Sequence, residues 1–153
     1  MSISSPMSIA LDEAELAFRR GEVPVGAVVL RDGEIIARDG NRVLELNDPT
    51  AHAEIMVIRA AGRKLKYERL CDCDIYVTLE PCMMCICAIS MARVKRVYYG
   101  AKNIQDGAVD SGVSFFAMGV CRHIPEIYDG FMAQEASELL RSFFNRLRKF
   151  TQD

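Results

Sequence analysis

The segment that most constrains the fold is an almost wholly apolar stretch, CMMCICAISMA, at residues 82–92. It follows Pro81, and proline is favoured in the first turn of a helix. A helix that is apolar on every side must also be covered on every side. We therefore expect a sheet against one face and further helices or a second copy of the chain against the other. Met83, Met84 and Met91 suit either core packing or a dimer interface.

The segments around this helix alternate between strand and helix patterns. Apolar, Val-rich runs predict strands at 24–30, 34–37, 74–79, 94–100 and 124–128. Helical spacing of apolar residues predicts helices at 9–20, 51–62, 81–92 and 132–150. A hairpin turn at Asp32-Gly33, a helix end at Gly21 and a loop at 41–49 complete the prediction. Strands that alternate with helices after an initial hairpin indicate an α/β sandwich with a mixed sheet.

The length of 153 residues suits one domain, 1–153, with a proper core. No apolar run approaches the roughly 20 residues that span a bilayer, and residues 1–10 lack the pattern of a signal peptide. We therefore expect a cytoplasmic protein without membrane contact. In that setting, six cysteines at short spacings indicate metal binding or packing rather than disulfides.

The net charge of −2 argues against a nucleic-acid ligand, but the charges are unevenly distributed. Basic residues predominate between 59 and 102 and at the end of the last helix, whereas acids gather at 106–138. The final group of bases comprises Arg141, Arg146, Arg148 and Lys149. This pattern is compatible with a basic, nucleic-acid-binding face or with ordinary solvated helices.

Three metal ligands are predicted by two short motifs. Cys82 and Cys85, three residues apart at a helix start, place both sulfurs on one face, and the helix N-terminus favours their thiolate forms. His52 lies at a second helix start and can add an imidazole. Three protein ligands leave a fourth tetrahedral position open, which is typical of a catalytic zinc site rather than a structural one.

Glu54, two residues after His52, supplies a carboxylate that need not bind the metal. It can take a proton from water and return it to a substrate. The motif H-x-E followed by P-C-x-x-C is typical of zinc-dependent nucleobase deaminases, which replace an exocyclic amine with oxygen. HAE and PCMMC together are a strong signal, whereas CxxC alone would be weak.

The other candidate ligands have simpler interpretations. Cys71 and Cys73 could form a closed four-cysteine site with the CxxC pair, but this would require strand 74–79 to fold as a knuckle and would leave HAE unexplained. Cys87 and Cys121 are expected to be small buried hydrophobes. His123 is expected to be structural or solvent-exposed.

Nearly the whole chain, from about residue 10 to 150, resembles the bacterial tRNA-specific adenosine deaminases of the cytidine-deaminase-like superfamily. The resemblance rests on EVPVGAV at 22–28, GNR at 40–42, NDPTAHAEI at 47–55, YVTLEPC at 76–82 with Cys85, and Phe143-Phe144 in a basic final helix. HAE and PCxxC would suit guanine, cytosine or nucleotide deaminases equally well. The other segments indicate the tRNA branch.

This resemblance implies a three-layer α/β/α sandwich with a five-stranded mixed sheet, assembled as a homodimer. It implies one Zn²⁺ per subunit, held by His52, Cys82 and Cys85, with Glu54 as general acid and base. The implied substrate is the wobble adenosine of a tRNA anticodon stem-loop, converted to inosine with release of ammonia. Further substrate contacts are implied for Asn41 with the flipped adenine and for Phe144 and Arg148 with the anticodon loop.

One position departs from the family pattern. Asn103 stands where the family usually has an aspartate associated with the substrate ribose. An amide there places no negative charge beside a polyanion, so we expect weaker discrimination between ribose and deoxyribose. Compensation by Asp106 in the same loop is an equally good interpretation.

Two other functions remain compatible with the sequence. A deaminase of a free base or nucleotide, guanine or cytosine, would act without RNA and would not need the basic tail. A zinc-stabilised binding protein would fill the fourth metal position with a protein group and would lose no activity on Glu54→Ala.

Overall fold

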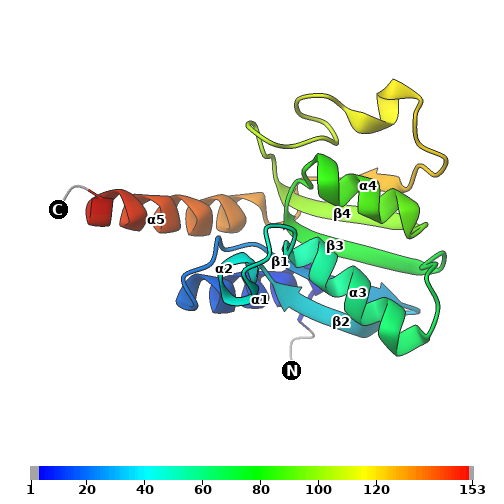
Figure 1. The fold of residues 1–153 in the computed structure, drawn as a ribbon, viewed down its shortest axis with the longest axis horizontal. Coiled ribbons are helices and arrows are strands. Elements are labelled where there is room, and N and C mark those ends of the chain that lie inside the picture. The colour runs from blue at the N-terminus through cyan, green and yellow to red at the C-terminus, as the bar shows by residue number, and fades with distance from the viewer. Residues whose placement is uncertain (1–3, 152–153) are drawn as a thin grey trace.

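The structure is a computed structural model that describes residues 4–151. Its centre is a five-stranded sheet in the order β2-β1-β3-β4-β5 (Figure 1). The strands are β1 (Gly26–Arg31), β2 (Glu34–Gly40), β3 (Cys73–Leu79), β4 (Arg96–Ala101) and β5 (Glu126–Tyr128). β1 is antiparallel to both β2 and β3, whereas β3, β4 and β5 are parallel. This confirms the predicted five-stranded mixed sheet.

Helices cover both faces of the sheet, so the three-layer prediction is also confirmed (Figure 1). The long helices are α1 (Pro6–Arg19), α3 (Ala53–Leu65), α4 (Met83–Met91) and α5 (Ala133–Thr151). Two short ones are α2 (Val43–Leu46) and the 3-10 helix η1 (Phe115–Met118). α3 and α4 lie on one face, α1 and α5 lie on the other, and α5 extends beyond the sheet.

Alternation along the strands divides the core between these two faces. Val29, Ile75 and Val97 point to the α3 and α4 side, where they join the largest cluster of buried residues. Val28 packs instead with Met7 of α1. A third cluster joins α1, β4 and α5 through Leu11, Ala101 and Ala136.

Gly26 allows α1 to lie directly on β1. A Cβ atom at this position would stand 1.9 Å from the carbonyl oxygen of Ala10 and 2.6 Å from the backbone nitrogen of Ala14. Any side chain would therefore push the helix away from the sheet.

The element boundaries differ from the prediction where local capping decides them. α1 begins at Pro6 rather than 9 because Ser5 caps it, accepting the N–H of Ser8 at 3.1 Å. α3 continues past Gly62 to Leu65 and ends at Lys66, which has a left-handed backbone. The predicted loop 41–49 contains α2, whose first turn is held by a distant carboxylate described below.

α4 packs on the sheet with one side, as expected, but its other side stays partly exposed within residues 4–151. Ile86 and Ile89 are fully buried against the sheet, but Met91 is 80% exposed. Met84, Cys87 and Ala88 are half-buried on the same side as Met91. We call these four residues the α4 stripe. Within residues 4–151 this stripe is only partly covered.

Within residues 4–151 no helix combines the length and the apolarity that crossing a membrane requires.

Candidate active site and metal centre

Two helix starts bring the predicted metal ligands together. His52 is the residue before α3, and Cys82 is the residue before α4. Both have extended backbones, so their side chains lie beside the N-terminal ends of the two helices. Cys85, one turn into α4, is fully buried behind them.

The three ligand atoms have the spacing that one tetrahedral ion needs. His52 Nδ1 lies 3.7 Å from Cys82 Sγ and 3.5 Å from Cys85 Sγ, and all three atoms lie within 4.8 Å of one another. Zinc bonds of about 2.1 Å to nitrogen and about 2.3 Å to sulfur, at a tetrahedral angle, place the two ligand atoms about 3.6 Å apart. The donor set and its geometry therefore fit Zn²⁺.

The electrostatics of the ligands also suit a cation. A hydrogen bond from Cys85 lowers the pKa of the Cys82 thiol to about 4. The same hydrogen bond, followed by burial, raises the pKa of Cys85. The hydrogen bond with Cys82 also raises the pKa of His52. Of the two cysteines, one is therefore readily deprotonated to a thiolate. Deprotonation of the second requires a cation bound between the two sulfurs.

Glu54 lies in the first turn of α3 and faces the metal ligands. Its side chain is buried, and its Oε2 accepts a hydrogen bond from Cys85 Sγ at 3.2 Å. Burial raises the pKa of this carboxyl group above its usual value. A carboxyl group with a raised pKa, lining a cavity, is suited to accept and return a proton.

The alternative four-cysteine site is wrong. Residues 73–79 form the extended strand β3 rather than a knuckle, so Cys73 and Cys82 lie at opposite ends of a seven-residue strand, roughly 20 Å apart. Among the described residues, the grouped candidate ligands are His52, Cys82 and Cys85. His123 is structural, because its Nε2 lies 2.6 Å from the carbonyl oxygen of Val94.

A cavity of about 940 Å³ opens above the ligands. Six of the predicted site residues line it: Asn41, His52, Glu54, Cys82, Asn103 and Phe144. Cys85 lies beneath the cavity, in contact with His52 and Glu54. Arg148 does not line it: this exposed residue lies further along α5, where its Nη2 donates to Asn145 Oδ1 at 2.9 Å.

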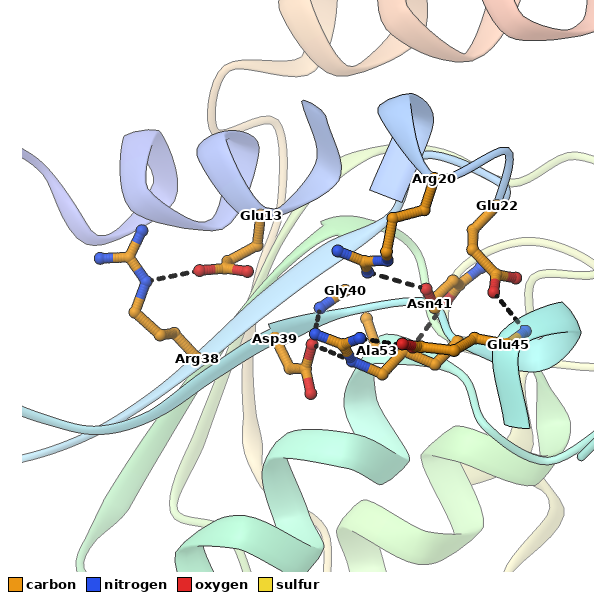
Figure 2. Close-up of polar contacts among 10 residues, drawn as sticks. Glu13, Arg20, Glu22, Arg38, Asp39, Gly40, Asn41, Glu45 and Ala53 are labelled. Atoms are coloured by element: carbon orange, nitrogen blue, oxygen red, sulfur yellow. Dashed lines mark hydrogen bonds and ion pairs between the residues drawn. The ribbon is translucent and has the colours of Figure 1, made fainter. Parts of the chain in front are cut away.

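Asn41 is fixed between α1 and α3, as Figure 2 shows. Its side-chain oxygen accepts the N–H of Ala53 at 2.8 Å, and its carbonyl oxygen accepts from Arg20 Nη2 at 3.0 Å. Since its amide oxygen is engaged, Asn41 has its side-chain NH₂ group left to offer to a ligand in the cavity.

The two neighbouring phenylalanines of α5 have different roles. Phe143 is buried and packs edge-on against Phe18 of α1, with ring centroids 5.6 Å apart. Phe144 is 44% exposed and lines the cavity, as does Leu147. Phe143 therefore anchors the helix, while the next residue presents an aromatic ring at the cavity mouth.

Two buried carboxylates that shape the cavity were given no site role by the sequence. Glu22 accepts the N–H of Glu45 at 2.9 Å, as Figure 2 shows. It also accepts the N–H of Leu44 at 2.9 Å and so fixes α2, which lies beside the cavity. Glu80 accepts hydrogen bonds from the segment after β4. Burial acts to raise the pKa of Glu80, but the hydrogen bonds from Ser111, Asp110 and Asn103 together lower it below its usual value. In the sequence, each of these two residues is a single acidic residue next to an apolar strand, and that is the pattern that could have identified them.

The family model of the cytidine and deoxycytidylate deaminase zinc-binding region matches residues 2–101. The chain therefore belongs to this family of zinc-binding deaminases. A tRNA-specific adenosine deaminase of Agrobacterium fabrum is 56% identical over 142 residues, which are 93% of this chain and 93% of the relative. Within the family, the chain thus belongs with the tRNA-specific adenosine deaminases.

Solved structures agree with this assignment. A structure from a study of A-to-I editing by tRNA A34 deaminases at the wobble position has a TM-score of 0.87 and 56% identity, covering 88% of this chain and 98% of that one. The X-ray structure of a guanine deaminase from Bacillus subtilis has a TM-score of 0.63 and 30% identity, covering 95% of both chains. The likeness is stronger to the tRNA deaminase.

Proposed function

We propose that this protein deaminates adenosine to inosine at the wobble position of a tRNA anticodon. The observation that carries the reaction is Glu54, a buried carboxyl group beside the three clustered ligands on the wall of a cavity. The substrate follows from relatives named tRNA-specific adenosine deaminases.

In the proposed reaction His52, Cys82 and Cys85 hold the zinc ion. When bound, zinc supplies Lewis acidity that lowers the pKa of a water molecule toward neutrality. Glu54 accepts a proton from the attacking water while the water oxygen forms a bond to carbon 6 of adenine. It gives that proton to the adjacent ring nitrogen, and a further proton transfer through Glu54 accompanies cleavage of the carbon–nitrogen bond. Ammonia leaves, and the base becomes hypoxanthine, so the nucleoside is inosine.

The surrounding residues hold the base and the RNA. The free NH₂ group of Asn41 donates to the flipped base, and Phe144 offers a ring at the cavity mouth for packing. Flipping costs little in an unpaired anticodon loop. Arg148, with its neighbouring bases on α5, lies outside the cavity, where phosphate contacts are expected.

The decisive assay uses an RNA anticodon stem-loop with adenosine at the wobble position and measures inosine. We expect turnover of this hairpin and none of free adenosine, cytosine or guanine. RNA affinity should fall steeply as salt rises, because Lys and Arg contacts to phosphate release counterions. Turnover of free guanine or cytosine at a rate that does not depend on salt concentration would instead identify a free-base deaminase.

The same assay tests the role of Asn103. Its Oδ1 accepts the N–H of Asp106 at 3.1 Å, so its NH₂ group is what it offers to the cavity it lines. An aspartate would offer a second acceptor to a ribose hydroxyl instead. We propose that Asn103→Asp raises the ratio of turnover on RNA to turnover on the matching DNA hairpin, and an unchanged ratio would contradict this.

We also propose that the chain is a homodimer joined through the α4 stripe. Support comes from its composition, since Met84, Cys87, Ala88 and Met91 form one apolar line on an exposed side of α4. An exposed apolar line of this kind is typical of an interface. The same proposal includes a single domain over 1–153, one zinc per subunit and, for a protein that acts on tRNA, a cytoplasmic location.

Met91→Lys should dissociate the dimer. Across a twofold interface, the lysine at position 91 would face either the same lysine of the second copy or an apolar surface. We therefore expect the dissociation constant of the dimer to rise roughly 100-fold or more. Sedimentation at micromolar concentration should give twice the 17.1 kDa chain mass for the wild type and the chain mass itself for the variant. Tyr67→Lys, at another exposed position, is the control and should stay dimeric. A wild-type monomer would refute the proposal.

A further inference from the structure

The carboxylate of Glu80 forms five hydrogen bonds with one segment, residues 102–111, which we call the β4 loop. Glu80 follows β3 directly and is 1% exposed. Its Oε1 accepts from Asn103 N–H at 3.2 Å and from Ser111 Oγ–H at 2.7 Å. Its Oε2 accepts three backbone N–H groups at 2.9–3.1 Å, those of Val109, Asp110 and Ser111.

The C-terminal part of the β4 loop is fixed by additional contacts. Gly107 forms a bridge with Cys82, and the N–H of Ala108 donates to the carbonyl oxygen of Pro81 at 3.0 Å. A Cβ atom on Gly107 would stand 2.6 Å from Glu80 Cδ, so the loop passes as close to this carboxylate as a backbone can. This part of the loop therefore remains in place without the Oε1 contacts.

The N-terminal part of the β4 loop forms a wall of the cavity and has fewer anchors. Residues 102–106 all line the cavity, and Ile104 is 79% exposed. The N–H of Asn103 is held by Glu80 Oε1, and the N–H of Asp106 is held by the Asn103 side chain. The carbonyl oxygen of Asn103 also accepts the N–H of Gly107 at 2.9 Å, which is a bond within the loop. Of these contacts, the one from Glu80 Oε1 ties the wall to a side chain outside the loop.

We propose that Glu80 is a positioning residue that sets substrate affinity by holding the cavity wall 102–106 through its Oε1 atom. The inference deepens the proposed function and depends on it for the identity of the substrate. Glu80 itself does not reach the reacting atoms in this scheme. Its loss should therefore weaken substrate binding while the chemical step continues.

The Glu80→Gln substitution should affect only one of the two parts of the β4 loop. Three N–H donors converge on the Oε2 position, so the single oxygen of glutamine must occupy that position. The NH₂ group then lies where Oε1 was. The Ser111 hydroxyl can rotate and accept from it, but the N–H of Asn103 faces a donor and loses its partner. Only the cavity wall is released.

The experiment combines amide hydrogen exchange with kinetics on the RNA hairpin. In Glu80→Gln we expect exchange at the Asn103 amide to accelerate about tenfold or more, while the 109–111 amides stay protected. The KM should rise about tenfold, with kcat within about twofold of wild type. Ser111→Ala is the matched control: it removes the other bond to Oε1, keeps the Asn103 bond, and should change neither quantity.

Unchanged Asn103 exchange and unchanged KM in Glu80→Gln would overturn the proposal. A fall in kcat at constant KM, together with a lower melting temperature and lost zinc, would also overturn it, because that pattern indicates a structural role. If this variant does not fold, Glu80→Asp keeps the charge, shortens the side chain and should shift exchange and KM in the same direction. The exchange experiment needs no substrate, so a wild type inactive on RNA would refute the proposed function separately.

Discussion

Replacing Glu54 by glutamine should lower kcat on the RNA hairpin by roughly a thousandfold, as expected when a general acid and base is lost. Glutamine has nearly the same shape and fits the same buried position beside Cys85, whose Sγ lies 3.2 Å from Glu54 Oε2. It cannot take a proton from water at neutral pH. The variant should therefore bind RNA and zinc like the wild type, and single-turnover inosine formation is the measurement.

The control for this variant is Glu13→Gln. Glu13 is another largely buried carboxylate, but it lies on α1, pairs with Arg38 at 2.6 Å and is not among the cavity residues. Its loss should leave kcat within about twofold, since its ion pair is partly exposed and far from the chemistry. If Glu54→Gln retains wild-type kcat, Glu54 is not the proton carrier, and a zinc-stabilised binding protein becomes the better interpretation.

Much of the fold was predictable because its local signals agree with one another. Asp32 and Gly33 both have positive φ angles, as the predicted hairpin turn requires, and each predicted apolar run overlaps one of the five strands. The order of strands β4 and β5 was beyond the sequence pattern. It depends on parallel pairing between segments far apart in the chain, which no local signal records.

The metal ligands were predictable for a similar reason. His52 and Cys82 are both helix caps, so short motifs fix their local geometry, and only the meeting of the two helix ends required the fold. The roles of Glu22 and Glu80 were not predictable. Each accepts hydrogen bonds from backbone N–H groups more than 20 residues away. Because nearly all residue types carry the same N–H group, the sequence does not indicate such a partner.

The sequence of α4 predicts contacts that the structure of one chain does not contain. Its apolar composition predicts cover on all sides, yet Met91 is 80% exposed among the described residues. The same helix begins with Cys82 and contains Cys85, so an interface on its outer face would lie directly behind the metal ligands. Dimer formation and the stability of the metal site should therefore be linked.

Removing the metal with a chelator should abolish activity and lower the melting temperature, and added Zn²⁺ should restore both. The reason for the stability change is linkage: an ion that binds only the folded site stabilises it in proportion to the logarithm of its concentration over the dissociation constant. At a thousandfold excess this is about 4 kcal/mol. For a chain of about 150 residues that corresponds to a shift on the order of 10 °C.

Cys82→Ser should reproduce the chelated state in the presence of zinc. The substitution removes the thiol whose pKa is lowered to about 4, the readiest thiolate of the site, and we expect zinc affinity to fall more than 100-fold. Zinc content by elemental analysis and the thiolate-to-metal absorption of the cobalt-substituted protein report the loss without any activity measurement. Cys71→Ser, at an exposed cysteine outside the ligand group, is the control and should retain full zinc. A Cys82→Ser protein that keeps its zinc and its absorption band would show that the ion is held elsewhere.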